Sequence, residues 1–304
     1  MAVKVENLYK KYGNQVVLDN ISFEARPQEI LGFLGPNGAG KTTTMKIITG
    51  ALHSDGGTVK INGQDIDTAN KDIKKIVGYL AEHNPLYQDM YVLEFLNFVA
   101  GIYKIPDKKK RIEELVEITG LEKEKNKKIS QLSKGYKQRI GLAQVLINDP
   151  DVLILDEPTS GLDPIQLKEI RLLIKEMGKN KTVILSTHIM QEVKALCDRV
   201  IILNNGKIVA DKDIAALEDS LDIKEKPVFV QFDREIPLSK LKTIRSINRI
   251  EMLENGFYKF FGEDDLIMRK NIFDFAKDNG YTLLTMHREQ IDVENVFIKL
   301  TGKQ

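Results

Sequence analysis

The sequence has few of the residues that mark cross-linked or membrane-spanning proteins. Its 304 residues include no tryptophan, nine prolines and one cysteine, Cys197, which cannot form an intrachain disulfide. Apolar runs such as 152–155 and 200–203 are far shorter than the roughly 20 residues that a membrane-spanning helix needs. The first residues show no cationic region followed by a long apolar stretch, so no secretory signal is expected. These absences predict a protein of the reducing cytoplasm whose fold depends on packing.

An excess of charge of either sign is also lacking. The 45 basic and 44 acidic residues give a formal net charge of +1, so no global field attracts nucleic acid or an anionic membrane surface. We therefore expect no nucleic-acid partner. Hydrophobic residues make up 42% of the chain and charged residues 29%, which is typical of globular proteins, and the length suggests about two domains.

The pattern of apolar runs changes along the chain. From residue 3 to about 213, short Val/Ile/Leu-rich runs alternate with longer helical stretches, which predicts an α/β domain with a largely parallel sheet. The expected buried strands are 29–34, 152–155, 182–186 and 200–204. A polar segment at 218–227 is expected to mark a boundary, giving domains 1–217 and 218–304. The second domain should be a small α+β unit with strands at 228–232, 257–261 and 281–286 and helices at 267–277 and 293–300.

One loop carries the most specific motif of the chain. It has the pattern G-x-x-x-x-G-K-T, follows an apolar strand and precedes a helix, as a phosphate-binding loop must. Its backbone N–H groups would surround phosphate oxygens, Lys41 would neutralise β/γ charge, and Thr42 would offer a hydroxyl to Mg²⁺. The expected nucleotide-binding residues here are Gly35, Pro36, Asn37, Gly38, Ala39, Gly40, Lys41, Thr42 and Thr43. The motif alone fits ATPases, GTPases and small-molecule kinases.

A second motif ends the strand at 152–155 in two adjacent carboxylates. Asp156 can hold Mg²⁺ through water, and Glu157 can act as general base toward the attacking water. In isolation such a pair is more often a solvated turn, but downstream of a phosphate loop the catalytic interpretation is favoured. Shortly before it, Ser133 opens a helix, either as an ordinary N-cap or as a phosphate-binding helix start.

The order of five motifs resembles the nucleotide-binding subunits of ABC transporters. They are GPNGAGKT at 35–42, LSKGYKQR at 132–139, LILDEP at 153–158, SGLD at 160–163 and STH at 186–188. The resemblance implies a P-loop ATPase domain with a RecA-like core, an antiparallel β subdomain and a helical subdomain, followed by the small α+β domain. It also implies a head-to-tail dimer that encloses two ATP molecules, each bound by Lys41 and Thr42 of one chain and by Ser133 and Gly135 of the other.

The resemblance assigns roles to three further residues. Tyr12 matches the aromatic residue that stacks on adenine, although a strand-end core role stays open. His188 matches the histidine that contacts the γ-phosphate. Asp163 matches the loop residue that links the two active sites across the dimer.

The chain departs from the family pattern at three places. Lys134 and Tyr136 replace a glycine and a glutamine of the usual signature, and Gln28 replaces a turn glycine. Glu82 stands where the family usually has a glutamine that senses Mg²⁺ and the lytic water. A carboxylate can ligate Mg²⁺ but adds negative charge beside the γ-phosphate, so the expected metal-binding residues are Thr42, Glu82 and Asp156.

Glu82, Lys134 and the small C-terminal domain together resemble the exporter branch of the family, which includes drug and polysaccharide or lipid exporters. The stretches 78–96 and 185–201 are similar to the component associated with gliding motility. The resemblance implies an ATPase at the inner face of the membrane, bound to separate permease subunits. A minority of Leu86, Tyr87, Tyr91, Phe95 and Phe98 should form an exposed patch for the permease. The tail is expected to regulate or stabilise. A soluble ABC ATPase of translation or DNA maintenance is the alternative, and a P-loop kinase leaves LSKGY and His188 unexplained.

Overall fold

The computed structural model describes residues 2–66, 73–219, 227–253, 256–262 and 264–288. These residues fall into two units, of which the first ends at Ala216 and the second begins at Leu217. The predicted boundary at residue 217 lies next to this division, and the roles given to the two domains stay predictions. Each unit is described by itself.

A mixed sheet of six strands forms the centre of the first unit. Its order is β10-β9-β3-β8-β7-β6, and all neighbours are parallel except β10 and β9. The strands are β3 (Ile30–Leu34), β6 (Val77–Leu80), β7 (Val152–Asp156), β8 (Thr182–Thr187), β9 (Arg199–Asn204) and β10 (Lys207–Asp213). Four of them were predicted to within one residue, because strands buried on both faces consist of continuous apolar runs.

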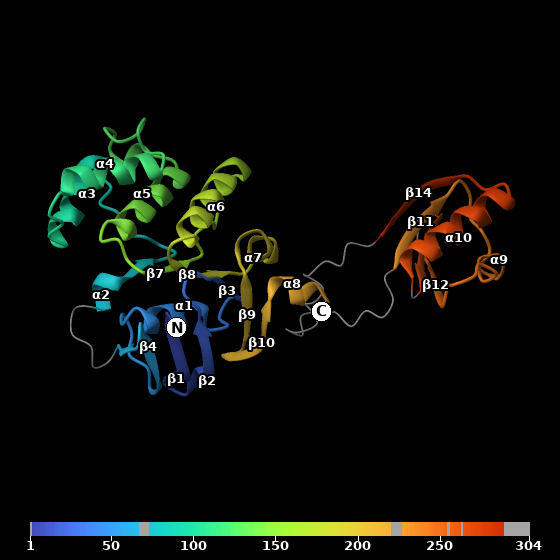
Figure 1. Ribbon diagram of the computed structural model, residues 1–304, viewed down its shortest axis with the longest axis horizontal. Coiled ribbons are helices and arrows are strands. Elements are labelled where there is room, and N and C mark those ends of the chain that lie inside the picture. Colours follow the sequence, from blue (N-terminus) through green and yellow to red (C-terminus); the bar gives the residue numbers. More distant parts are fainter. Residues whose placement is uncertain (1, 67–72, 220–226, 254–255, 263, 289–304) are drawn as a thin grey trace. The chain divides into compact units, whose positions relative to one another are not determined.

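A second, antiparallel sheet packs against the central one (Figure 1). Its order is β2 (Gln15–Ala25), β1 (Val3–Tyr12), β4 (Gly56–Ile61) and β5 (Gln64–Asp65). One buried cluster joins Leu8 and Leu18 of this sheet to Phe33 of β3 and Met45 of α1 (Lys41–Ile48). This packing fixes the phosphate loop between the two sheets.

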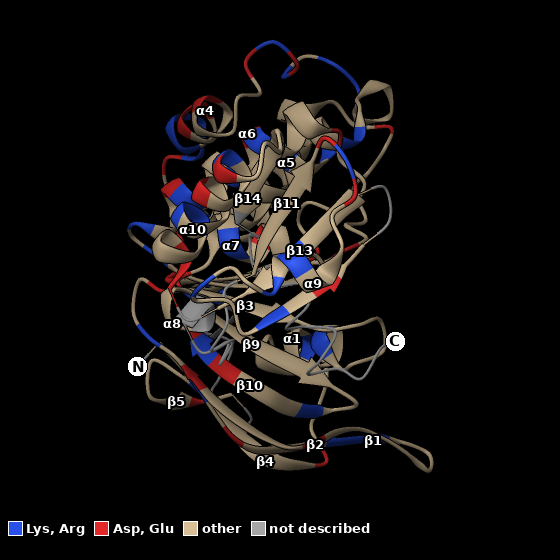
Figure 2. Ribbon diagram, turned by 90° about the vertical axis from the view of Figure 1, so that its right-hand side faces the viewer, with Lys and Arg blue, Asp and Glu red and all other residues tan. Residues whose placement is uncertain are grey.

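The helices of the first unit form two groups. α3 (Val92–Ile102), α4 (Lys108–Ile118) and α5 (Lys134–Leu146) gather at the end away from β1, β2 and β4 (Figure 1). The others are α2 (Ile73–Ile76), α6 (Pro164–Gly178), α7 (Met190–Leu196), the 3₁₀ turn Ile129–Gln131 and α8 (Ile214–Asp219), of which only the first three residues belong to this unit. Both signs of charge intersperse on α4 and α6 (Figure 2). Among the residues that the structure describes, no helix has the length and apolarity to cross a membrane.

The second unit is a small α+β fold. Its strands are β11 (Val228–Phe232), β12 (Arg249–Met252), β13 (Phe257–Phe261) and β14 (Leu283–Arg288), with α9 (Leu238–Leu241) and α10 (Asp265–Asp278). The sheet order β12-β13-β11-β14 with every pair antiparallel is that of a split βαβ fold. Met268 and Ile272 of α10 pack on Val230 and Tyr258. The predicted helix at 293–300 lies outside the described residues.

Candidate functional site

The phosphate-binding loop connects β3 to α1, as predicted. Gly40 precedes the helix with φ of 109°, a conformation that favours glycine. A Cβ on Gly35 would lie 2.4 Å from the carbonyl oxygen of Leu203, so a side chain there would collide with backbone. Both glycines are therefore needed by the local geometry of the loop.

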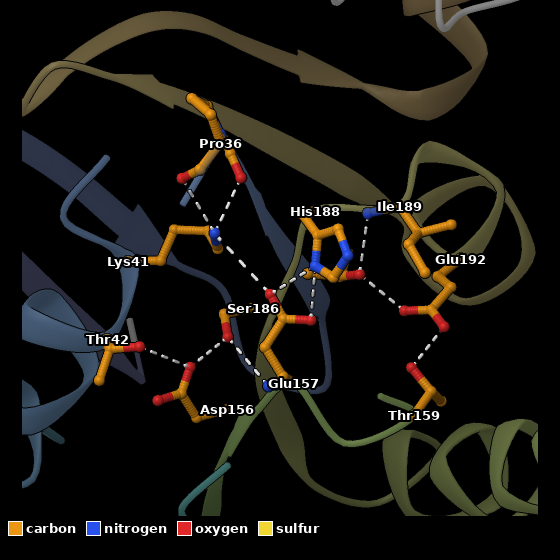
Figure 3. A network of polar contacts seen from close by, with 12 residues as sticks. Pro36, Lys41, Thr42, Asp156, Glu157, Thr159, Ser186, His188, Ile189 and Glu192 are labelled. Atoms are coloured by element: carbon orange, nitrogen blue, oxygen red, sulfur yellow. Dashed lines mark hydrogen bonds and ion pairs between the residues drawn. The ribbon is translucent and has the colours of Figure 1, made fainter. Parts of the chain in front are cut away.

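Lys41 is buried and turned toward its own loop. Its Nζ donates to the carbonyl oxygens of Gly35 at 2.8 Å and Pro36 at 3.3 Å, and lies 3.8 Å from Oε1 of Glu157 (Figure 3). Burial lowers the pKa of Lys41, and the negative charge of Glu157 opposes that shift. The ammonium thus has three oxygen partners within the protein.

Asp156 ends β7 beside the loop. Its Oδ1 accepts hydrogen bonds from the hydroxyls of Thr42, at 3.2 Å, and of Ser186. Its Oδ2 is buried and has no hydrogen-bond partner among the described residues. Ser186 lies opposite Asp156 in the register of β7 and β8, a contact that strand pairing could have predicted once both strands were aligned.

The donors around Asp156 fit Mg²⁺. In the described ranges, no group of three or more His, Cys, Asp or Glu side chains forms a metal cluster. Mg²⁺ commonly keeps several waters and takes one or two carboxylates together with substrate phosphates. The free oxygen of Asp156 and the hydroxyl of Thr42 meet that need.

Glu157 occupies a left-handed backbone conformation, with φ of 49°, which is uncommon for a residue other than glycine. Its backbone N–H donates to the Ser186 hydroxyl at 3.1 Å. Nδ1 of His188 lies 3.0 Å from both carboxylate oxygens. Burial raises the pKa of Glu157, and the contact with His188 opposes the shift. The strained turn therefore presents a carboxylate with raised proton affinity to its histidine partner.

A cleft of about 520 Å³ brings many of the predicted residues together. The loop, Glu82, Glu157 and His188 all line it, and Glu82 is an exposed residue. The full lining is Gln15, Val17, Asn37, Gly38, Gly40, Lys41, Thr42, Thr43, Glu82, Glu157, Ser160 and His188. The sequence predictions missed Gln15 and Val17, which carry no motif signal, and Ser160, which opens the SGLD motif at 160–163 but was given no role. Tyr12 ends β1 with half of its surface exposed, so it is not a core residue.

The predicted signature and dimer residues lie at helix starts outside this lining. Ser133 is the N-cap of α5 and accepts from the backbone N–H of Tyr136, and Nε2 of Gln166 donates to it at 3.4 Å. Asp163 is the N-cap of α6 and accepts from the N–H groups of Ile165 and Gln166, each at 3.0 Å. A Cβ on Gly135 would lie 2.4 Å from Oε1 of Gln166, so the glycine lets α6 approach the signature.

The aromatic patch is larger than predicted. Tyr87, Tyr91 and Phe98 are exposed, whereas Leu86 and Phe95 are buried, so three of the five residues form the surface rather than a minority. The reason is that Tyr87 packs edge-on against Phe98, with ring centroids 5.7 Å apart, instead of entering the core.

Comparison with known proteins gives the same assignment. The sequence matches the ABC transporter family over residues 18–160. The bacitracin transport ATP-binding protein of Bacillus licheniformis is 32% identical over 99% of this chain and 97% of its own length. A Nod factor export ATP-binding protein of Burkholderia pseudomallei is 36% identical over the same shares of the two chains.

Two solved structures are similar to the first unit. One is cbiO1 from Clostridium perfringens, part of the ABC transporter complex cbiONQ, with TM-score 0.67 and 31% identity over 73% of this chain and 92% of its own. The other is a dimeric post-hydrolysis state of an ATP-binding cassette bound to ADP and Pi, with TM-score 0.63 and 27% identity over 70% of this chain and 98% of its own. The predicted fold is confirmed. The chain belongs to the ATP-binding proteins of ABC transporters, and it is an ATPase that binds and hydrolyses ATP.

Proposed function

We propose that the chain dimerises on ATP and drives a separate membrane permease, with export as the direction of transport. The observation that carries the proposal is that the motif residues lie in two separate places in the chain's own structure. Lys41, Glu157 and His188 share one cleft, whereas Ser133 and Gly135 lie at the start of α5 outside its lining. A second copy can supply its own α5 start to complete the phosphate site.

The residues of the cleft support a separate role for each side chain in ATP binding and hydrolysis. Lys41 would exchange the carbonyl oxygens of its loop for phosphate oxygens. Thr42, Asp156 and Glu82 would hold Mg²⁺, which supplies charge neutralisation at the β- and γ-phosphates when bound. Glu157 would take a proton from the attacking water, and His188 would orient that carboxylate and contact the γ-phosphate. Tyr12 would stack on adenine.

The proposed direction of transport rests on similarity to relatives, and the proposed permease partner rests on similarity and on one exposed aromatic surface. Relatives at 32% and 36% identity are named for bacitracin transport and Nod factor export. The exposed rings of Tyr87, Tyr91 and Phe98 offer an apolar contact for a permease. The chain would then work in the cytoplasm, attached to the inner face of the membrane through that permease. A role in gliding motility is a narrower proposal that rests on the stretches 78–96 and 185–201.

The dimer is tested with Glu157→Gln, which removes the base but keeps the phosphate contacts. With Mg-ATP, size-exclusion chromatography should shift this variant toward a dimer, and the variant without nucleotide is the control. A strict monomer at saturating ATP would refute a homodimer.

The partner is tested separately, by purification of the tagged chain from native membranes in detergent. A co-purifying integral membrane protein supports the transport role, and its identity tests the gliding assignment. Co-purification with ribosomes or DNA instead would favour a soluble ABC ATPase.

A further inference from the structure

A buried carboxylate outside the cleft connects the two loops that carry the reacting groups. Glu192 lies on α7 and is 1% exposed. Its Oε1 accepts from the hydroxyl of Thr159, and its Oε2 accepts from the hydroxyl of Thr187 at 2.7 Å (Figure 3). One oxygen thus binds a hydroxyl from the loop after β7, and the other binds a hydroxyl from the last residue of β8, directly before the loop that carries His188.

The two threonines stand close to the catalytic contact. Thr159 follows Glu157 by two residues, on the loop that leads to Asp163. Thr187 directly precedes His188, and its hydroxyl also accepts from the N–H of Ile189 at 3.1 Å. Glu192 therefore fixes the backbone on both sides of the contact between Glu157 and His188.

The burial of this group needs a reason. A buried carboxylate is costly unless it is hydrogen-bonded, and a short helix such as α7 can be anchored by apolar residues alone. Met190, Val193 and Leu196 already bury the apolar side of α7. The two hydroxyl partners of Glu192 are neutral, so its contribution is directional: it sets where the two loops lie relative to each other.

We propose that Glu192 is a positioning residue for ATP hydrolysis, which ties the loop after β7 to the loop after β8 and so aligns His188 with Glu157. The inference rests on the proposed roles of Glu157 and His188. It also makes α7 the element through which a displacement of the Asp163 loop reaches His188.

The test uses variants that separate alignment from simple stability. Glu192→Ala removes both acceptors, Thr159→Val removes one hydroxyl, and Thr159→Ser restores it. Glu29→Ala is the control, because Glu29 is also buried and lies away from the cleft, where it accepts from the backbone N–H of Arg26 and pairs with Arg199 at 3.4 Å. Rates and ATP dissociation constants are measured below the unfolding temperature of every variant.

For Glu192→Ala we expect kcat to fall by about a hundredfold, as for a small misplacement of reacting groups, with the ATP dissociation constant little changed. Thr159→Val should lower kcat as well, and Thr159→Ser should recover it. Glu29→Ala should lose stability but keep kcat. Equal kcat for the Glu192→Ala and Glu29→Ala proteins would overturn the inference.

A second measurement does not depend on hydrolysis. The chain has four histidines, so the ring ¹⁵N signals of His188 can be assigned with a His188→Gln variant. These signals should shift in Glu192→Ala and Thr159→Val but not in Glu29→Ala. Unshifted signals in Glu192→Ala would overturn the inference. If these variants show the expected shifts but Glu157→Gln does not slow hydrolysis, the proposed role of Glu157 is overturned while the positioning of His188 stands.

Discussion

The ammonium group of Lys41 can bind either oxygen atoms of the protein or phosphate oxygens of a nucleotide. In the structure its ammonium group binds carbonyl oxygens of the loop and lies near Glu157, and phosphate oxygens would offer stronger, charge-assisted hydrogen bonds. We predict that Lys41→Ala abolishes measurable ATP binding by isothermal titration calorimetry, because the β- and γ-phosphate charges lose their cation. Unchanged ATPase activity would falsify the assignment of the phosphate loop.

Glu82 lines the cleft with a carboxylate at the position where the sequence resemblance leads us to expect a glutamine. Glu82→Gln removes that charge and adds a hydrogen-bond donor, so the Mg²⁺ concentration needed for half-maximal hydrolysis should change. The measurement is a pair of Mg²⁺ titrations at fixed ATP. Identical curves and rates would show that Glu82 neither binds the metal nor restrains catalysis.

Glu157 makes stability depend on pH. Burial raises its pKa, so the folded chain binds this proton more tightly than the unfolded chain does. The charged form therefore destabilises the fold above the folded-state pKa, and this penalty vanishes as the pH falls below the ordinary glutamate value of about 4.3. Glu157→Gln should raise the melting temperature at neutral pH, with a benefit that shrinks on acidification. A benefit that grows toward acid pH would contradict the direction of this shift.

At the scale of elements, Asp163 caps the start of α6, and we propose that it also links the two ATP sites across the dimer. Its carboxylate caps two backbone N–H groups, and a cap of this kind contributes about 1 kcal/mol. Asp163→Ala should lower the free energy of unfolding by roughly that amount in urea denaturation, whereas Asp163→Asn, which keeps the acceptor, should restore it. If ATPase activity stays low in a restored Asp163→Asn protein, the carboxylate acts at the dimer interface as well as in the cap. Equal stability of all three proteins would remove the capping role.

The elements differ in how far sequence could predict them. The strands at 152–155 and 182–186 were found because continuous apolar runs have no other stable place than a sheet buried on both faces. β12 was missed because it is only four residues long and two of them, Arg249 and Glu251, are charged, and α9 was missed because it is a single turn. Pairing with β13 stabilises β12, and burial of Leu241 in the core stabilises α9.

The candidate site was partly predictable for a similar reason. Motifs indicate residues that are expected to contact phosphate or water, so Lys41, Asp156, Glu157 and His188 were predicted from the sequence. Ser186 lies within the STH motif, and strand pairing could place it beside Asp156. Glu192 lies outside the five motifs, so only three-dimensional contacts reveal its hydrogen bonds.

At the scale of the whole molecule, the two units allow a direct test of independence. The lining of the cleft comes entirely from residues before Ala216. A fragment of residues 1–219 should therefore bind ATP with the affinity of the full chain, provided that circular dichroism shows it to be folded. A folded fragment without ATP binding would mean that the tail contributes to the site and that the predicted division into domains is wrong.

The topology of the second unit has a mechanical consequence. β11 and β14 are antiparallel neighbours, and Val228 at the start of one lies opposite Arg288 at the end of the other. A pull between these two positions loads the outermost backbone pair first and the next only after that pair has opened. The hydrogen bonds then break in succession, as in a zipper, rather than together, as they do when strands are sheared along their length. Tension on the flanking chain should thus peel this sheet open at low force, however high its melting temperature.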